Sequence, residues 1–138
     1  AGMFVTVWFG IYQISKGRLT AANAGHEYPA VKRAGGSFEL FKDKHGFVMA
    51  GMEDVSYREY EMELHAGDVL FVYTDGVTEA TDENKQLYGT DRMLEALNRK
   101  AEESAQELLQ EVRTDIDRFV GNAEQFDDIT MMAVKVRK

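Results

Sequence analysis

The first part of the chain carries apolar residues at alternating and at adjacent positions. Within residues 3–15, Phe9 and Ile11 fall on one face of an extended chain, while Trp8 and Tyr12 fall on the other. A strand that is apolar on both faces is usually covered on both faces. The pattern therefore predicts a strand that is central in a layered fold.

Turn signals and further apolar alternation predict several antiparallel strands after it. Ser15-Lys16-Gly17 is typical of a hairpin loop, with Gly17 supplying a positive φ. Glutamates alternate with apolar residues in one later segment, which indicates a strand with one solvated face. Another segment has five consecutive apolar residues, as buried strands do. The predicted strands after the hairpin loop cover residues 18–24, 28–32, 37–41, 57–64, 69–73 and 129–136.

Helical periodicity appears only in the last third of the chain. We expect one helix that is capped by Thr90 and runs to about Lys100, and a second that begins with the capping-box pair Ser104 and Glu107. Gly121 is placed to end the second helix. Because strands come first and helices follow, the order predicts an α+β fold with two packed sheets flanked by helices.

Composition narrows the functional classes. The 138 residues include 44% hydrophobic residues, eight Phe, six Tyr and one Trp, which suits one folded domain with a sizeable core. A net charge of −8 without any basic cluster argues against a nucleic-acid partner. No cysteine is present, and the longest apolar run is too short to span a bilayer. We therefore expect no membrane partner and a cytoplasmic location.

Two groups of aspartates stand where strands are predicted to end or begin. Asp75 directly follows the buried strand, and the pair Asp127-Asp128 precedes the last one. If these strands are antiparallel neighbours, the carboxylates converge at one end of a sheet, where they repel each other unless cations bridge them. Oxygen ligands of this kind suit Mg²⁺ or Mn²⁺, and two such ions could activate water for hydrolysis. The alternative is that both motifs are ordinary solvated turns.

A longer series of motifs favours the metal site over ordinary turns. It resembles the sporulation stage II E and RsbU-type phosphatases, a bacterial branch of the PP2C-like (PPM) metal-dependent phosphatase family. The resemblance covers nearly the whole chain in the right order. It is carried by Ala22-Asn23-Ala24-Gly25-His26, by the stretch 67–80 (GDVLFVYTDGVTEA), by Leu87-Tyr88-Gly89 and by Asp127-Asp128-Ile129-Thr130.

The resemblance implies a four-layer αββα sandwich, in which two antiparallel sheets pack between helices and the metal site lies at one end. It implies hydrolysis of phosphoserine or phosphothreonine by metal-activated water, with a small anti-anti-sigma protein of the STAS class as the usual substrate. Asp75, Asp127 and Asp128 match the metal-binding motifs, with Asp75 in "TDG" followed by the motif glycine Gly76. The cofactor implied is a pair of Mn²⁺ or Mg²⁺ ions.

One departure from the family pattern affects how well this chain alone can bind metal and catalyse. The earlier Gly-Asp motifs, which supply the other bridging aspartate, do not appear in this sequence. Residues 1–138 are therefore expected to be the carboxyl-terminal portion of such a domain, without its first strands and most of its first helix. Alone, the chain should bind metal weakly and catalyse poorly. An apolar face is expected where the other strands would pack, which makes a homodimer a hypothesis.

Three alternatives remain open from the sequence. A catalytically degenerate phosphatase fold could act as a regulatory or partner-binding module, and an unrelated metal-dependent hydrolase could share only the carboxylates. His26 could serve as a general acid near the phosphate, or its imidazole could simply orient a turn.

Overall fold

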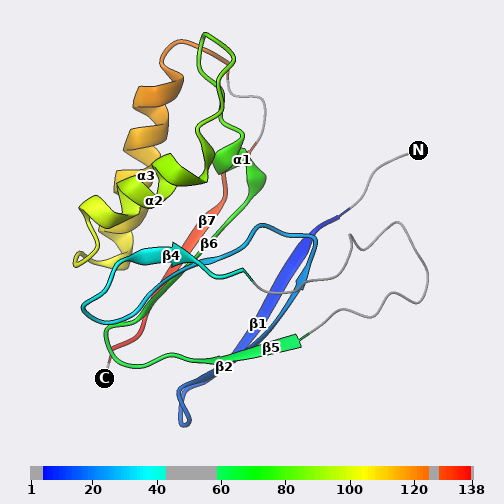
Figure 1. The fold of residues 1–138 in the computed structure, drawn as a ribbon, viewed down its shortest axis with the longest axis vertical. Helices are drawn as coiled ribbons and strands as arrows, with labels where there is room; N and C mark the ends of the chain where they lie inside the picture. Colours follow the sequence, from blue (N-terminus) through cyan, green and yellow to red (C-terminus); the bar gives the residue numbers. More distant parts are fainter. Residues whose placement is uncertain (1–4, 43–58, 125–127, 138) are drawn as a thin grey trace.

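The computed structural model describes residues 5–42, 59–124 and 128–137, and Figure 1 shows their arrangement. Strands come first, helices follow, and one strand closes the chain, as the sequence predicts. The elements in order are β1 (Val7–Gln13), β2 (Arg18–Ala24), β3 (Ala30–Lys32), β4 (Phe38–Leu40), β5 (Glu59–Glu63), β6 (Val69–Tyr73), α1 (Asp75–Thr78), α2 (Gly89–Arg99), α3 (Ala105–Val120) and β7 (Met131–Lys135).

The strands form two antiparallel sheets that pack on each other. The three-stranded sheet has the order β1-β2-β5, and the four-stranded sheet has the order β4-β3-β6-β7. Leu19 and Met62 of the first sheet share one apolar cluster with Leu70 and Val72 of the second. Helices α2 and α3 cover the other face of the four-stranded sheet (Figure 1). The two packed sheets of the predicted fold are confirmed, and within the described residues the helices lie on one side of them.

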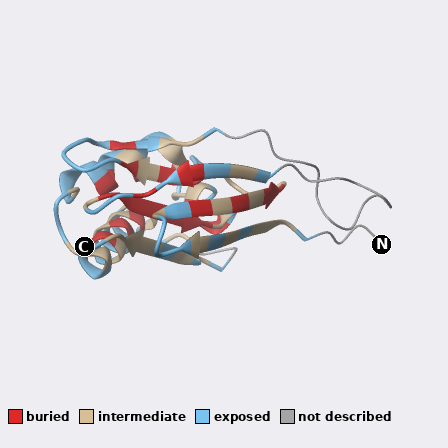
Figure 2. Ribbon diagram, turned by 90° about the horizontal axis from the view of Figure 1, so that it is seen from below, coloured by how far each residue is buried: buried red, intermediate tan, exposed pale blue. Residues whose placement is uncertain are grey.

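Strand β6 lies in the middle of this arrangement. Its five residues are all buried, with no more than 9% of any of them exposed. Phe71 and Tyr73 face the helices, whereas Leu70 and Val72 face the other sheet. Figure 2 shows the buried residues concentrated along the inner strands. The run of consecutive apolar residues therefore identified a strand that is covered on both sides.

Strand β1 differs from its prediction. Trp8 faces the core, where its indole N–H donates to the hydroxyl of Tyr60 at 2.8 Å. Phe9 and Ile11 on the opposite face are each 60% exposed, and among the described strands β1 pairs with β2 alone. The prediction of a central strand is wrong for this part of the structure, because no described element covers the outer face of β1. The expected exposed apolar face is present, whereas the homodimer stays a prediction.

The helices begin with different kinds of cap. At α3 the expected cap is confirmed, since the hydroxyl of Ser104 accepts a hydrogen bond from the backbone N–H of Glu107 at 3.2 Å. At α2 the prediction of a Thr90 cap is wrong, because the helix already starts at Gly89. The preceding Tyr88 is buried and its hydroxyl donates to Asp115 of α3 at 2.6 Å. Tyr88 makes no side-chain cap, and its hydroxyl instead ties the start of α2 to α3.

Two lysines tie the helix layer to the sheet. Lys32 of β3 and Lys135 of β7 flank Val69 of β6 in one row across the sheet. The ammonium group of Lys32 lies 3.2 Å from the carboxylate of Glu102, and that of Lys135 donates to the carbonyl groups of Glu102 and Glu103. The loop between α2 and α3 is thereby held against the end of the sheet opposite Asp75.

Asp68 joins two turns just before β6. Its buried carboxylate accepts hydrogen bonds from the backbone N–H groups of Ala34 and His65, both at 2.8 Å, and from the guanidinium of Arg33 at 3.0 Å. Burial alone would raise the pKa of Asp68, but these three donors together hold that pKa below its usual value. Asp68 thus links its own turn to the β3–β4 turn.

We expect Asp68→Asn to lower the free energy of unfolding by about 2 kcal/mol at neutral pH, because an amide has one acceptor oxygen and leaves a buried N–H unpaired. The carboxylate has a folded-state pKa below its unfolded value. Its contribution is therefore present above the unfolded pKa and is lost as pH falls through the folded pKa. Urea unfolding should show the two proteins converging below about pH 4. The exposed Glu61→Gln serves as control, and a gap that persists in acid would contradict this account.

Candidate metal centre

The end of β6 and the start of β7 lie side by side, as the sequence predicts. In the antiparallel register Tyr73 pairs with Met131. The pairing continues one step further, since the backbone N–H of Thr74 donates to the carbonyl of Thr130 at 3.0 Å. Residues 74–76 and 128–130 therefore form one end of the four-stranded sheet, which we call the rim.

Gly76 brings the two segments of the rim into direct contact. A Cβ atom at this position would lie 2.1 Å from the carbonyl oxygen of Asp128 and 3.5 Å from the Cα of Ile129. Such a separation is far inside van der Waals contact, so only glycine fits here. The missing side chain of Gly76 is the space into which the Asp128 backbone packs.

The backbone at Asp75 is fixed, while its carboxylate remains open to solvent. Asp75 is the first residue of α1, and its carbonyl accepts a hydrogen bond from the N–H of Glu79 at 2.8 Å. Val77, two residues on, is fully buried in the core beneath the helices. Asp75 itself is exposed, as is Asp128 across the rim. A rigid backbone with accessible carboxylates is the arrangement that a metal site needs.

Asp75 and Asp128 are the two predicted ligands that the structure places, and it brings them to the same rim. Asp127 lies outside the described residues. Within the described part of the chain, no group of three or more acidic or histidine side chains is arranged to hold a metal ion. The described residues thus supply two carboxylates, and the ligand roles of Asp75, Asp127 and Asp128 stay a prediction.

The loop between β2 and β3 reaches the same end of the sheet. Ala30 pairs with Phe71, so the residues before β3 lie near the end of β6. The buried side chain of Asn23 organises this loop by accepting from the N–H of His26 at 2.8 Å and donating to the carbonyl of Glu27. Nδ1 of His26 lies 3.2 Å from the hydroxyl of Thr6. The backbone of His26 is thus tied to Asn23, while its imidazole lies beside Thr6, and both readings of the imidazole stay predictions.

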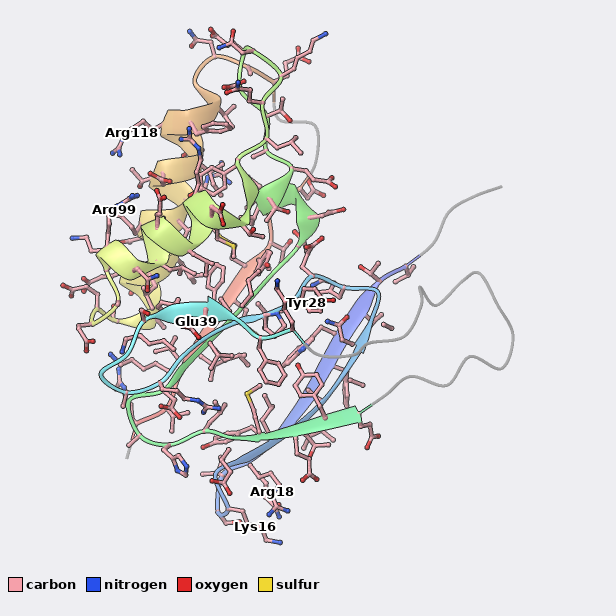
Figure 3. All side chains as sticks on the ribbon, viewed as in Figure 1. Lys16, Arg18, Tyr28, Glu39, Arg99 and Arg118 are labelled. Atoms are coloured by element: carbon pink, nitrogen blue, oxygen red, sulfur yellow. The ribbon has the colours of Figure 1, made fainter. Side chains whose placement is uncertain are left out.

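Among the described residues, this end of the sheet carries the acidic side chains Asp75 and Asp128. The hydroxyl of Tyr73 is buried without a hydrogen-bond partner in the described part of the chain, and burial together with the charge of Glu27 raises the pKa of this tyrosine. Tyr73 therefore stays neutral. Figure 3 shows Lys16 and Arg18 at the hairpin end of the molecule, away from α1. An anionic phosphate would find little attraction here without bound cations.

The donor set fits a hard divalent cation. Both described carboxylates offer oxygen ligands that Mg²⁺ and Mn²⁺ prefer, and both are accessible. The space that Gly76 leaves open lets the backbones carrying them approach closely. Nothing in this set favours a soft metal, since the chain has no cysteine.

Comparison with known sequences shows the family of the chain. The family profile of stage II sporulation protein E (SpoIIE) matches residues 1–137. Protein IcfG of Synechocystis sp. is 35% identical over 133 residues, which cover 96% of this chain and 20% of IcfG. Phosphoserine phosphatase RsbU of Bacillus subtilis is 26% identical over 137 residues, which cover 98% of this chain and 40% of RsbU. The chain thus spans well under half of either relative.

Comparison with solved structures supports the fold. The SiaA-PP2C domain of Pseudomonas aeruginosa superposes with a TM-score of 0.76 at 19% identity, over 94% of this chain and 50% of that one. The Mn-presoaked phosphatase domain of SpoIIE from Bacillus subtilis gives a TM-score of 0.70 at 18% identity, over 96% of this chain and 56% of that one. At these identities the likeness concerns the fold alone. None of the described helices is long and apolar enough to cross a bilayer.

The close approach at Gly76 predicts an unusual response to alanine. Within a helix, glycine to alanine normally stabilises a protein by up to about 1 kcal/mol. Here we expect Gly76→Ala to destabilise it by about 1–3 kcal/mol, because the new methyl group meets backbone that cannot move aside. Urea unfolding measures the change. Gly36→Ala is the control, since its Cβ would lie 3.3 Å from the nearest atom, and equal effects at both positions would contradict the prediction.

Proposed function

Because this chain belongs to the stage II sporulation protein E family, we propose that it is part of a metal-dependent protein serine/threonine phosphatase. The observation that carries the proposal is the contact between Gly76 and the backbone of Asp128. That contact brings two exposed carboxylates, remote in sequence, to one rim of a PP2C-type fold. Ordinary solvated turns would not require so close an approach.

In this proposal Asp75, Asp127 and Asp128 hold Mn²⁺ or Mg²⁺. Bound divalent ions would polarise the phosphoryl group and lower the pKa of a water that attacks it. The protein's own part is positional. Strands β6 and β7 fix the backbone on either side of the rim, and the exposure of Asp75 and Asp128 leaves them open to a phosphorylated side chain of another protein. His26 lies in the neighbouring loop, where its backbone N–H donates to the side chain of Asn23.

The described carboxylates alone do not make a two-metal centre. We propose that further ligands come from a segment outside these 138 residues, in keeping with the share of the relatives that the chain spans. The chain by itself is then expected to bind metal weakly and to hydrolyse phosphoesters poorly. In the longer protein, cations held by the carboxylates would make the local electrostatic potential of this acidic chain positive, which favours a phosphate.

The proposed substrate is phosphoserine or phosphothreonine on a cytoplasmic regulatory protein, such as an anti-anti-sigma protein of the STAS class. Support comes from the relative RsbU, a phosphoserine phosphatase, and from the motif resemblance. The open rim also suits a phosphorylated loop of a folded partner better than a small molecule, because both carboxylates are solvent-exposed.

A second candidate is a catalytically degenerate fold that acts as a regulatory or partner-binding module. It is favoured by the observation that the described residues hold no group of three potential ligands. The two candidates differ in one measurable property, which is metal-dependent turnover by the longer protein.

Removing the Asp75 carboxylate should separate these candidates. In the full-length protein we expect Asp75→Asn to abolish Mn²⁺-dependent release of phosphate from a phosphoserine STAS protein, with a loss of about 100-fold or more, because metal-ion stabilisation of the reacting phosphoryl group is lost. Asp91→Asn, an exposed aspartate in the first turn of α2, is the matched control and should retain activity.

Three outcomes are informative. Loss of turnover in Asp75→Asn alone supports the phosphatase and the assigned ligand. Full activity in Asp75→Asn would show that the metal role is wrong. A full-length protein without Mn²⁺-dependent turnover would favour the regulatory module. The 138-residue chain, assayed beside it, tests whether ligands from outside the chain are needed.

A further inference from the structure

We infer that Thr74 is a positioning residue of the metal centre, which couples the segment carrying Asp75 to the segment carrying Asp128. The inference rests on the proposed function, since it concerns the same rim. It goes beyond that function by assigning the coupling to a side-chain hydroxyl that binds no metal itself.

The first observation is that the Thr74 side chain does not cap α1. Thr74 is the N-cap residue of α1, with an extended backbone (φ −95°, ψ 166°), and threonine at such a position normally accepts a hydrogen bond from the helix backbone. No side-chain cap is formed here. The hydroxyl binds the β7 side of the rim and leaves the first N–H groups of α1 without a side-chain acceptor.

The second observation is where the hydroxyl goes. Its oxygen accepts a hydrogen bond from the backbone N–H of Thr130 at 3.2 Å. It also lies 3.4 Å from the carbonyl oxygen of Asp128 and 3.5 Å from that of Thr130. The Thr130 carbonyl already accepts the N–H of Thr74. The single hydroxyl proton is therefore best placed to serve Asp128.

These contacts act together with the glycine next to Asp75. Thr74 holds the backbone on both sides of Ile129, and Gly76 receives the same carbonyl oxygen of Asp128 into the space of its missing side chain. Asp75 lies between these two residues in sequence. Its backbone is thus attached on either side to the segment that carries Asp128, which fixes the separation of the two candidate ligands.

The chemistry of the contact specifies the variants. Valine has nearly the shape of threonine but neither donates nor accepts, so Thr74→Val leaves the Thr130 N–H without this acceptor. Serine keeps the hydroxyl and loses one methyl group, so Thr74→Ser should restore the coupling. Ser104→Ala removes the cap of α3, at the opposite end of the helix layer from the rim, and provides a destabilised protein with an intact rim.

The test measures Mn²⁺ affinity directly in the full-length protein, by calorimetric titration with the metal alone, beside thermal unfolding in the absence of metal. We expect Thr74→Val to weaken Mn²⁺ binding about tenfold, as removal of groups that orient metal ligands commonly does. Thr74→Ser should remain within about twofold of the unchanged protein, because it keeps the same donor and acceptor. Ser104→Ala should lower the melting temperature without altering Mn²⁺ affinity.

The outcomes separate this inference from the proposal beneath it. Unchanged Mn²⁺ affinity in Thr74→Val, with binding abolished in Asp75→Asn, would overturn the role of Thr74 and leave the metal centre standing. Equal weakening in Thr74→Val and Ser104→Ala would reduce the effect to general stability and also overturn it. If Asp75→Asn still binds Mn²⁺ with unchanged affinity, the proposed metal centre itself is wrong.

Discussion

The burial of β6 on both faces is the constraint on which the rest of the structure depends. Between the helices on one side and the second sheet on the other, all five residues are buried and none is charged, and burying a charge without a partner would cost stability. Polar chemistry can appear only where the strand leaves this enclosure. Thr74 and Asp75 occupy that position, so the place of the carboxylate follows from the packing of the strand that precedes it.

The pairing of β6 with β7 places a second acid, Asp128, at the same rim as Asp75. Once Val69 is opposite Lys135 and Tyr73 opposite Met131, the register brings the residues before β7 beside the residues after β6. A shift by one residue would turn the β7 side chains to the other face of the sheet. Lys135, held by the α2–α3 loop, helps to fix this register from the far end.

Features that depend on local periodicity could be predicted from the sequence, and features that depend on distant partners could not. Alternation identified β5, the hairpin loop identified β2, and the Ser104 cap needed only residues within one turn. The predicted Thr90 cap is wrong, since α2 already starts at Gly89, after a buried Tyr88 whose hydroxyl contacts the distant Asp115. The uncovered outer face of β1 cannot be located from its own residues, because Phe9 and Ile11 look the same whether or not an element packs on them.

At the candidate site, too, local motifs could be predicted and contacts between distant residues could not. The contacts that join the Asp75 segment to the Asp128 segment are uncharged, for a reason that follows from the charges of the two aspartates. Motifs predicted Asp75 and Asp128 as acids of one site, but carboxylates brought to one rim repel each other when no cation lies between them. Attraction between the ligands therefore cannot assemble the rim before metal binds. The groups that hold its segments together have to be neutral and short. A hydroxyl at Thr74 and an absent side chain at Gly76 meet that requirement, and neither role can be seen until the strands are paired.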